Sequence, residues 1–362
     1  MRPKKQKQSS SRLGILTFIL ILTTTGLGYK AYTYGLLGGP AQYVKVPAEY
    51  ADHPWEFDGR QTESYFGAAV WRAILAGEYG KLERWGNDIR KHNRRFPDGR
   101  MMLDTYYDGL VYMYPGTDRK EYTDRLTLIE EWGRKYPNSI TQPIALASMY
   151  AVFGWAARGN DFADKVTPEG WKYFHERLKK AQQILVTNQA RCRVCPRWYS
   201  EMMQVALAEN EPRADYETFF NEAVTKFPDY IPFYEDKINY LQPKWHGQPG
   251  EWQAFALATG QEKGPDYYAR LYHYARGDNV NELLKKSPPD WPMLKAGWQK
   301  IVADNPRSPW DLNMFAAYAV AAGDRATAKE LFAKIGEKEV PYAWEEFDLT
   351  FENAKAWAEG GR

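Results

Sequence analysis

Residues 309–335 read PWDLNMFAAYAVAAGDRATAKELFAKI, and this stretch decides the fold class of the chain. Small and apolar residues precede Gly323, and Ala328 and Phe332 follow it four residues apart. Residues four apart share one face of a helix, and a glycine commonly ends a helix. The stretch therefore predicts two helices, joined at Gly323, that approach closely at small residues such as Ala316.

This spacing resembles the tetratricopeptide repeat, in which a small residue marks the helix contact, a glycine marks the turn and an aromatic ring fills the second helix. The resemblance is full over 309–340, partial over 140–158 and poor between them. It implies an all-α fold, an irregular helical-repeat solenoid with a concave surface for partners. A compact irregular α-domain with tetratricopeptide-like pieces is the alternative.

Helices are expected to recur from about residue 61, and few or no strands are expected. Gly77 should break the first helix, and four later helices should stop near a proline, which cannot continue a helix. The four stops are Phe96-Pro97, Tyr136-Pro137, Phe227-Pro228 and Asn305-Pro306.

The first residues combine a basic tail without acidic residues and an apolar run, Leu13 to Gly28. A basic end stays in the cytoplasm while the apolar segment enters the membrane. Tyr29 to Tyr34 suit the membrane interface and extend the segment. The domains expected are a cytoplasmic tail (1–12), a transmembrane signal anchor (13–35), a linker (36–60) and an exported helical domain (61–362).

Two alternatives to an anchor remain. The triplet Gly26-Leu27-Gly28 has the small residues of a signal-peptide cleavage site, and the apolar run is also compatible with a buried core helix. The anchor interpretation places the chain in the inner membrane as a single-pass protein, with its C-terminal domain periplasmic or otherwise extracytoplasmic. Within that domain, sub-boundaries are expected near 160–165 and 278–290.

Composition narrows the class of partner. The formal net charge is +2 over 362 residues, which argues against nucleic acid, since nucleic-acid binding favours a basic face. Aromatic residues make up 15% of the chain, with 14 Trp, 26 Tyr and 16 Phe. Such rings either fill the gaps between helices, as expected for the tyrosines of 267–274, or line a groove that stacks on a sugar or peptide.

The central region holds word-like strings that begin with Cys192-Arg193-Val194-Cys195-Pro196-Arg197-Trp198-Tyr199. A second string runs from Tyr240 through Pro243-Lys244-Trp245-His246-Gly247 to Gly250-Glu251-Trp252. Together they resemble an uncharacterised bacterial family, a domain of unknown function that shares C-x-x-C-P-x-W-Y and Y-L-x-P-K-W-x-G segments. The resemblance implies a bacterial origin and a helical fold, and it carries over no catalytic residue.

The second string predicts a rigid connector between helices, because proline and glycine punctuate it. Its tryptophans are expected to insert into the helices that it joins. A ligand site on this connector is the alternative, because functional residues favour loops on a rigid scaffold. Its candidate binding residues are Lys244, Trp245, His246, Glu251 and Trp252.

Cys192 and Cys195 are the only cysteines. Outside the cytosol a disulfide persists, so a disulfide that locks the turn before Pro196 is the favoured interpretation. The alternatives are a thiol–disulfide exchanger, an inert reduced pair, and a zinc site completed by His175 or His246. No metal or cofactor is predicted.

No phosphate-binding loop, H-E-x-x-H pair or G-x-S-x-G elbow occurs, so no catalytic residue is assigned and binding is favoured over catalysis. Asp104 and Asp108 share a helix face and have the residue type for acid–base work on a sugar, although a solvated face is the ordinary interpretation. The sequence favours a membrane-anchored helical-repeat scaffold that binds a protein partner on the exported side. The alternatives are a domain that binds or processes cell-wall glycan through an aromatic-lined groove, and a redox helper.

Overall fold

The computed structural model describes residues 62–111, 119–276 and 280–361. The predicted tail (1–12), signal anchor (13–35) and linker (36–60) lie outside the described residues. No helix within the described ranges has the length and the apolar character needed to cross a membrane.

The described part of the chain is all α-helical, which confirms the all-α part of the predicted fold class. The described residues form 18 α-helices and no β-strand. They contain one isolated β-bridge, between Arg95 and Met101. The first nine helices are α3 (Thr62–Leu75), α4 (Tyr79–His92), α5 (Met102–Val111), α6 (Arg119–Lys135), α7 (Thr141–Arg158), α8 (Pro168–Thr187), α9 (Gln189–Cys192), α10 (Pro196–Ala208) and α11 (Arg213–Lys226). The others are α12 (Pro232–Tyr240), α13 (Glu251–Lys263), α14 (Pro265–Tyr274), α15 (Val280–Lys286), α16 (Trp291–Asp304), α17 (Pro309–Ala321), α18 (Arg325–Ile335), α19 (Pro341–Glu345) and α20 (Phe351–Ala358).

Three of the four predicted proline stops are confirmed. Helices α6, α11 and α16 end one residue before Tyr136, Phe227 and Asn305. Helix α4 ends earlier, at His92, because Asn93 takes a left-handed conformation with φ 46°. The chain then forms a tight hairpin over residues 94–102, held by the bridge between Arg95 and Met101.

Helices α17 and α18 form the antiparallel pair predicted from 309–335. Gly323 makes the turn between them with φ 73°, in the left-handed region that glycine adopts without strain. Ala316 and Ala328 are fully buried, and Phe332 stacks on Trp344 of α19 at a ring distance of 5.2 Å. Both helices are capped, since the side chains of Ser308 and Asp324 accept backbone N–H groups of the first turn.

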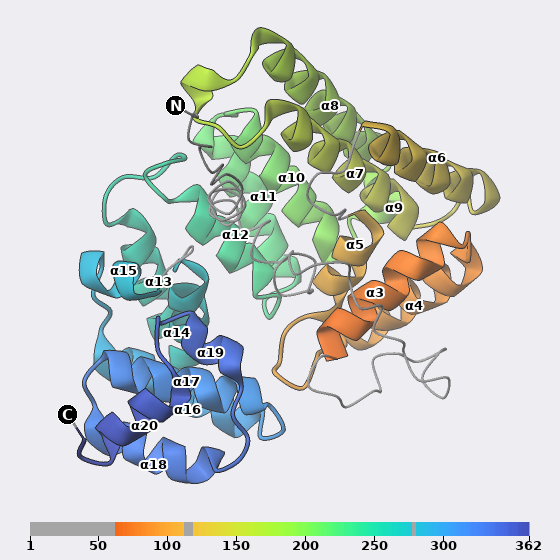
Figure 1. Ribbon diagram of the computed structural model, residues 1–362. Helices are drawn as coiled ribbons and strands as arrows, with labels where there is room; N and C mark the ends of the chain where they lie inside the picture. The colour runs from red at the N-terminus through yellow and green to blue at the C-terminus, as the bar shows by residue number, and fades with distance from the viewer. Residues whose placement is uncertain (1–61, 112–118, 277–279, 362) are drawn as a thin grey trace, which may run out of the picture.

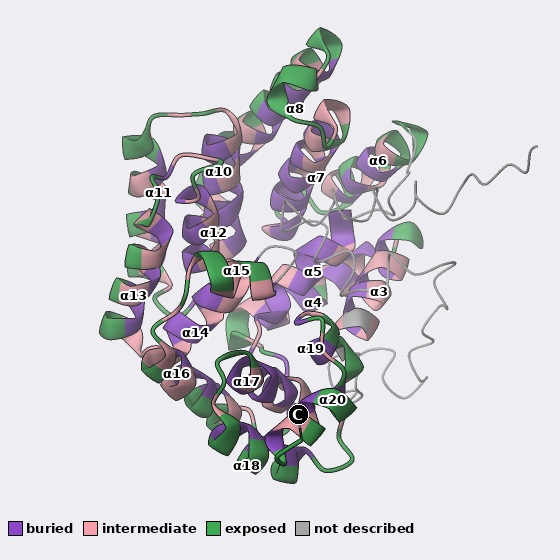
Figure 2. Ribbon diagram, turned by 60° about the vertical axis from the view of Figure 1, so that its left-hand side comes forward, coloured by how far each residue is buried: buried purple, intermediate pink, exposed green. Residues whose placement is uncertain are grey.

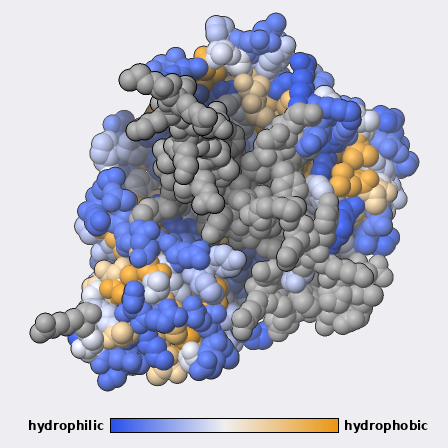
Figure 3. Space-filling model, in the orientation of Figure 1, coloured by the Kyte–Doolittle hydropathy of each residue, from blue (hydrophilic) through white to orange (hydrophobic). Residues whose placement is uncertain are grey.

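The helices follow one another along an arc (Figure 1). The chain runs from α3–α5 through α6–α9 and α10–α12 to the C-terminal group α16–α20. Figure 2 shows that buried residues gather on the inward sides of the helices, while exposed residues lie on outward sides such as those of α11 and α13. The face seen in Figure 3 is mostly hydrophilic where described residues form it, with small and separate apolar groups.

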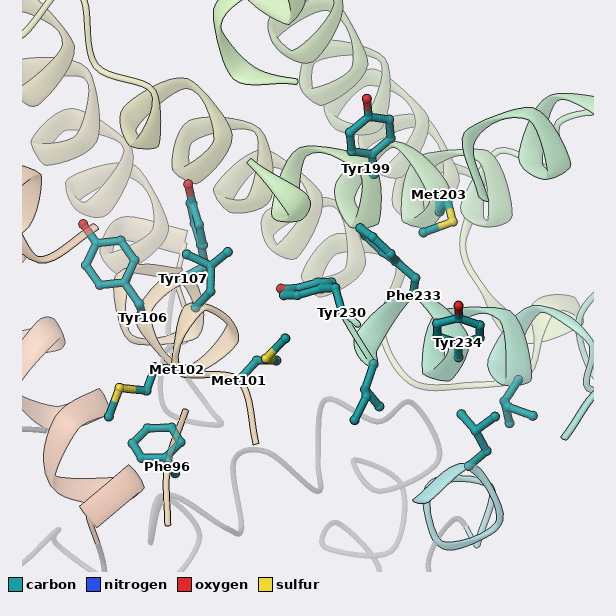
Figure 4. Close-up of a cluster of buried hydrophobic side chains, with 14 of the residues drawn as sticks. Phe96, Met101, Met102, Tyr106, Tyr107, Tyr199, Met203, Tyr230, Phe233 and Tyr234 are labelled. Carbon is teal, nitrogen blue, oxygen red and sulfur yellow. The ribbon is translucent and has the colours of Figure 1, made fainter. Parts of the chain in front are cut away.

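Aromatic rings fill the interior. Of the 14 tryptophans, all but Trp55 lie in described residues, and none of these is exposed. The rings of Tyr106, Tyr199 and Tyr230 belong to one cluster of buried side chains, from α5, from α10 and from the turn before α12 (Figure 4). In α14 the predicted core tyrosines Tyr267, Tyr268 and Tyr272 are buried. The packing interpretation of the aromatic excess is therefore confirmed for the described part of the chain.

Candidate functional site

The predicted connector joins α12 to α13, and its tryptophans point into the protein. Trp245 packs edge-on against Trp155 with the ring centres 5.9 Å apart. Trp252 is 6% exposed and lies against Tyr272 of α14 at 5.2 Å. A Cβ on Gly247 would lie 1.8 Å from the Leu241 carbonyl oxygen, so the turn requires glycine. The rings of the connector therefore serve packing.

The polar groups of the connector do not converge on one point. The His246 ring stacks on Tyr240, and its Nε2 lies 3.0 Å from the Leu207 carbonyl oxygen. Glu251 pairs with Arg213 of α11 and accepts the Gln248 backbone N–H at 2.9 Å. Lys244 is exposed to solvent. Of the five candidate residues, Lys244 lies at the exposed surface, and the other four contact neighbouring helices.

The predicted disulfide is not formed, which corrects the favoured interpretation of Cys192 and Cys195. Both are free, fully buried thiols. They take different partners: Cys192 Sγ donates to the Ile140 carbonyl oxygen, and Cys195 Sγ lies 3.5 Å from the Tyr107 hydroxyl. Burial raises the pKa of Cys192 to about 11, whereas a working redox thiol needs a lowered pKa. This environment favours an inert reduced pair.

Asp104 and Asp108 of α5 do share a face, and this face is buried against Arg197 of α10. The guanidinium contacts Asp104 at 3.2 Å, Asp108 at 3.3 Å and Glu201, one turn along α10, at 2.7 Å. Asp104 also accepts the Tyr230 hydroxyl at 2.8 Å. A buried guanidinium among carboxylates requires such satisfied geometry to offset its desolvation. We call these residues the Arg197 cluster; it ties α5, α10 and the start of α12 together.

A second charged cluster lies where the 94–102 hairpin meets the C-terminal half. The hairpin turns at Phe96-Pro97-Asp98-Gly99, closed by a 2.9 Å hydrogen bond from the Gly99 N–H to the Phe96 carbonyl oxygen. Proline second and glycine fourth are favoured in such a turn. Asp98 is 8% exposed, and its carboxylate accepts the backbone N–H and Nε of Arg100 at 3.0 and 2.7 Å. Despite its burial, these bonds hold the pKa of Asp98 below its usual value.

Two hydrogen bonds and one close approach join this hairpin to segments far along the chain. Arg270 of α14 donates to the Asp98 carbonyl oxygen at 3.2 Å, across 172 residues. Arg95 donates to the Asp229 carbonyl oxygen at 3.1 Å. A Cβ on Gly99 would lie 3.0 Å from both Arg270 Nη2 and the Asn305 side-chain oxygen. We call this contact between the hairpin and the segment 270–311 the junction.

Asp311, in the first turn of α17, lies near enough to the junction for the charges of Asp98, Arg270 and Arg100 to act on it. Its residue is 4% exposed, and its Oδ2 has no hydrogen-bond partner among the described atoms. Its backbone N–H donates to the Ser308 cap at 3.2 Å. Burial, followed by the negative charge of Asp98, raises the pKa of Asp311 to about 7, while Arg270 opposes the rise. Asp311 is therefore a carboxyl group that titrates near neutral pH.

His273 completes the surroundings of the junction. Its Nδ1 lies 3.1 Å from the Tyr318 hydroxyl, and its ring packs edge-on against Trp298 at 5.7 Å. Burial, followed by the charges of Arg276, Arg100 and Arg270, lowers the pKa of His273 well below its usual value. Arg276 pairs with Glu346 at 2.8 Å. His273 is thus neutral, and the positive charge here comes from arginines.

Sequence reasoning did not find the junction. Its residues come from segments about 170 to 213 positions apart, with no periodic spacing that links them. The one local signal is Pro97-Asp98-Gly99, which predicts a turn but not its partner. Asp311 reads in sequence as an ordinary acidic residue in the first turn of a helix.

No protein-family model, curated protein or solved structure matches this chain. The resemblance to the uncharacterised bacterial family therefore stays a prediction. In the described parts of the chain, no group of three or more His, Cys, Asp or Glu side chains is arranged to hold a metal ion.

Proposed function

We propose that this protein is a membrane-anchored helical-repeat scaffold that binds a protein partner on the exported side. The anchor in this proposal rests on the sequence of residues 13–35 alone. The scaffold rests on the described helices, whose successive antiparallel pairs pack on their neighbours along the chain. Stacks of this kind present extended surfaces to partners.

The observation that carries the proposal is the α17–α18 pair. Ala316 and Ala328 are buried without exposure, Gly323 makes the turn, and Phe332 fills the space beside the pair. This arrangement supports a tetratricopeptide-like unit within an irregular solenoid. The α7–α8 pair supports it in part, since Gly154 approaches the Phe174 backbone closely: a Cβ there would lie 3.3 Å from its carbonyl oxygen.

The placement of the rings favours a protein partner over the glycan alternative. A sugar-binding groove needs flat rings on its wall, whereas the connector tryptophans Trp245 and Trp252 contact Trp155 and Tyr272 inside the protein. Asp104 and Asp108, the carboxylate pair considered for glycan chemistry, are engaged by Arg197. These contacts leave the glycan interpretation without its motivating residues.

The proposal is tested by photo-crosslinking in intact cells. The full-length chain would carry a photoreactive amino acid at exposed positions of successive helices, for example Lys179 on α8, Glu262 on α13 and Lys329 on α18. We expect a discrete crosslinked protein from positions on one face, and none from a matched set on the other. Uniform absence of protein adducts, together with co-sedimentation of the purified chain with cell-wall glycan, would overturn the proposal in favour of the alternative.

A further inference from the structure

We propose that the junction is a proton-controlled clasp: it holds the arc of helices closed while Asp311 carries a proton, and it releases when Asp311 becomes charged. The inference goes beyond the proposed function, because it concerns the chain's own conformation and holds for any partner.

The geometry gives the clasp two sides. One side is the 94–102 hairpin, which brings Asp98 and Arg100 from the N-terminal helices. The other is formed by Arg270, Asn305 and Asp311 on α14, at the end of α16 and on α17. The direct bond across the junction is that from Arg270 to the Asp98 carbonyl oxygen. This bond joins segments 172 residues apart, so a change of charge beside it acts on the contact between the two sides.

Asp311 is placed to sense a proton. It is the only charged residue of α17, and its Oδ2 lies buried without a hydrogen-bond partner among the described atoms. When protonated, the carboxyl group gains a donor and loses its repulsion from the Asp98 carboxylate. When ionised, two buried carboxylates oppose each other across the junction, and like charges in a buried site are unfavourable. Arg270 and Arg100 offset this only in part, since the pKa of Asp311 still rises to about 7.

Several charged groups of the elements packed on α17 have partners of their own. From α16, Lys295 pairs with Asp324 at 2.9 Å, and Lys300 pairs with Asp304 at 2.6 Å. From α18, Arg325 lies over the Trp357 ring. Glu346, beyond α19, pairs with Arg276; burial raises the pKa of Glu346, and the charges of Arg276 and Arg100 oppose the rise. The groups that act on Asp311 are therefore Asp98 and Arg100 from the hairpin and Arg270 from α14, with the Ser308 hydroxyl from its own cap.

His273 does not reproduce this behaviour. Its protonation at low pH would add a positive charge among Arg100, Arg270 and Arg276, which disfavours the closed state on the acid side. The clasp is accordingly expected to close over a window below neutral pH and to open above it. If His273 alone governed the clasp, the clasp would open as pH falls rather than as pH rises. The direction of the pH response therefore distinguishes His273 from Asp311.

The experiment is a distance measurement across the arc by pulsed electron paramagnetic resonance on the full-length protein in lipid nanodiscs. Spin labels are attached through genetically encoded amino acids at Lys91 of α4 and Lys329 of α18, both exposed. This leaves the buried thiols unchanged. We expect the short distance to dominate at pH 5 and longer distances to dominate at pH 8, because the closed state loses stability as pH rises from the ordinary pKa of Asp311 towards about 7.

Three variants make the test specific. Asp311→Asn stays neutral and should remain closed at both pH values. Asp304→Asn, a matched change of an exposed carboxylate on α16, should keep the shift. Gly99→Ala adds a Cβ at φ 79°, within 3.0 Å of Arg270 and Asn305, and should be open at both pH values while circular dichroism remains helical. A distance independent of pH in the native chain, or a shift that persists in Asp311→Asn, would overturn the proposal.

Discussion

The titration of single buried side chains sets how the stability of this protein depends on pH. The pKa of Asp311 is raised from 3.8 to about 7, so the folded protein holds a proton over a range in which the unfolded chain has lost it. The free energy of unfolding therefore falls as pH rises from about 4 to about 7. His273 acts in the opposite direction, because its pKa is lowered in the folded state.

Replacing Asp311 by Asn should stabilise the protein at alkaline pH. The shift of about three pKa units corresponds to an upper bound of about 4 kcal/mol. The gain should be full at pH 8 and should vanish below about pH 3, where the folded and unfolded states of the native chain both hold the proton. Urea unfolding followed by tryptophan fluorescence measures it. If the variant is no more stable than the native chain at pH 8, the raised pKa of the buried Asp311 carboxyl group is contradicted.

Replacing His273 by Gln should flatten the acid side of the stability profile. Below its usual pKa of 6.5, the unfolded chain binds a proton at His273 that the folded protein excludes. The native chain therefore loses stability as pH falls below about 6.5, and the variant should lose less over the same range. The comparison concerns slopes between pH 6.5 and pH 5, since the lost packing on Trp298 lowers stability at every pH. Equal slopes would contradict the prediction.

The two thiols should be unreactive in the folded protein and reactive after unfolding. Cys192 and Cys195 are fully buried, and burial raises the pKa of Cys192 to about 11. We expect a thiol reagent at pH 8 to modify neither cysteine in the native chain, and both once urea is added without a reductant. If unfolding exposes no reactive thiol, the two cysteines are joined by a disulfide, which would contradict the assignment of both as free thiols.

At the scale of elements, the Arg197 cluster joins α5, α10 and α12. Arg197→Met should destabilise the protein by about 3–5 kcal/mol, because it leaves buried carboxylates without their guanidinium. The matched control is Arg213→Met, whose ion pairs with Glu217 and Glu251 are half exposed and should contribute about 0–1 kcal/mol. Chemical unfolding of both variants checks the contrast, and equal small losses would refute it.

The elements were the most predictable part of this chain, and their mutual placement was the least. Local signals such as Gly323 and Pro306 act within a few residues, so the α17–α18 pair and the end of α16 follow from them. Cys192 and Cys195 were predicted wrongly as a disulfide, because spacing does not reveal which neighbour each sulfur takes. The raised pKa of Asp311 depends in part on the charge of Asp98, more than 200 residues away, which no local pattern encodes.

At the scale of the whole molecule, the arc brings residues near 98 against residues near 270 and 305. Arg270→Ala removes the direct hydrogen bond across the junction, and we expect it to raise protease sensitivity in the 94–102 hairpin. Limited proteolysis with mapping of the first cuts measures this change. Cleavage confined to other loops, as in the native chain, would contradict a holding role for Arg270.

The long span of that contact has a consequence for synthesis. A growing polypeptide emerges from its N-terminus, so the hairpin leaves the ribosome well before α14 and α17 exist. Pairing between segments so far apart in sequence also carries a large entropic cost of loop closure and forms late. We therefore expect the early helices to assemble while Asp98 still faces water, and only about the last quarter of translation supplies Arg270 and Asp311.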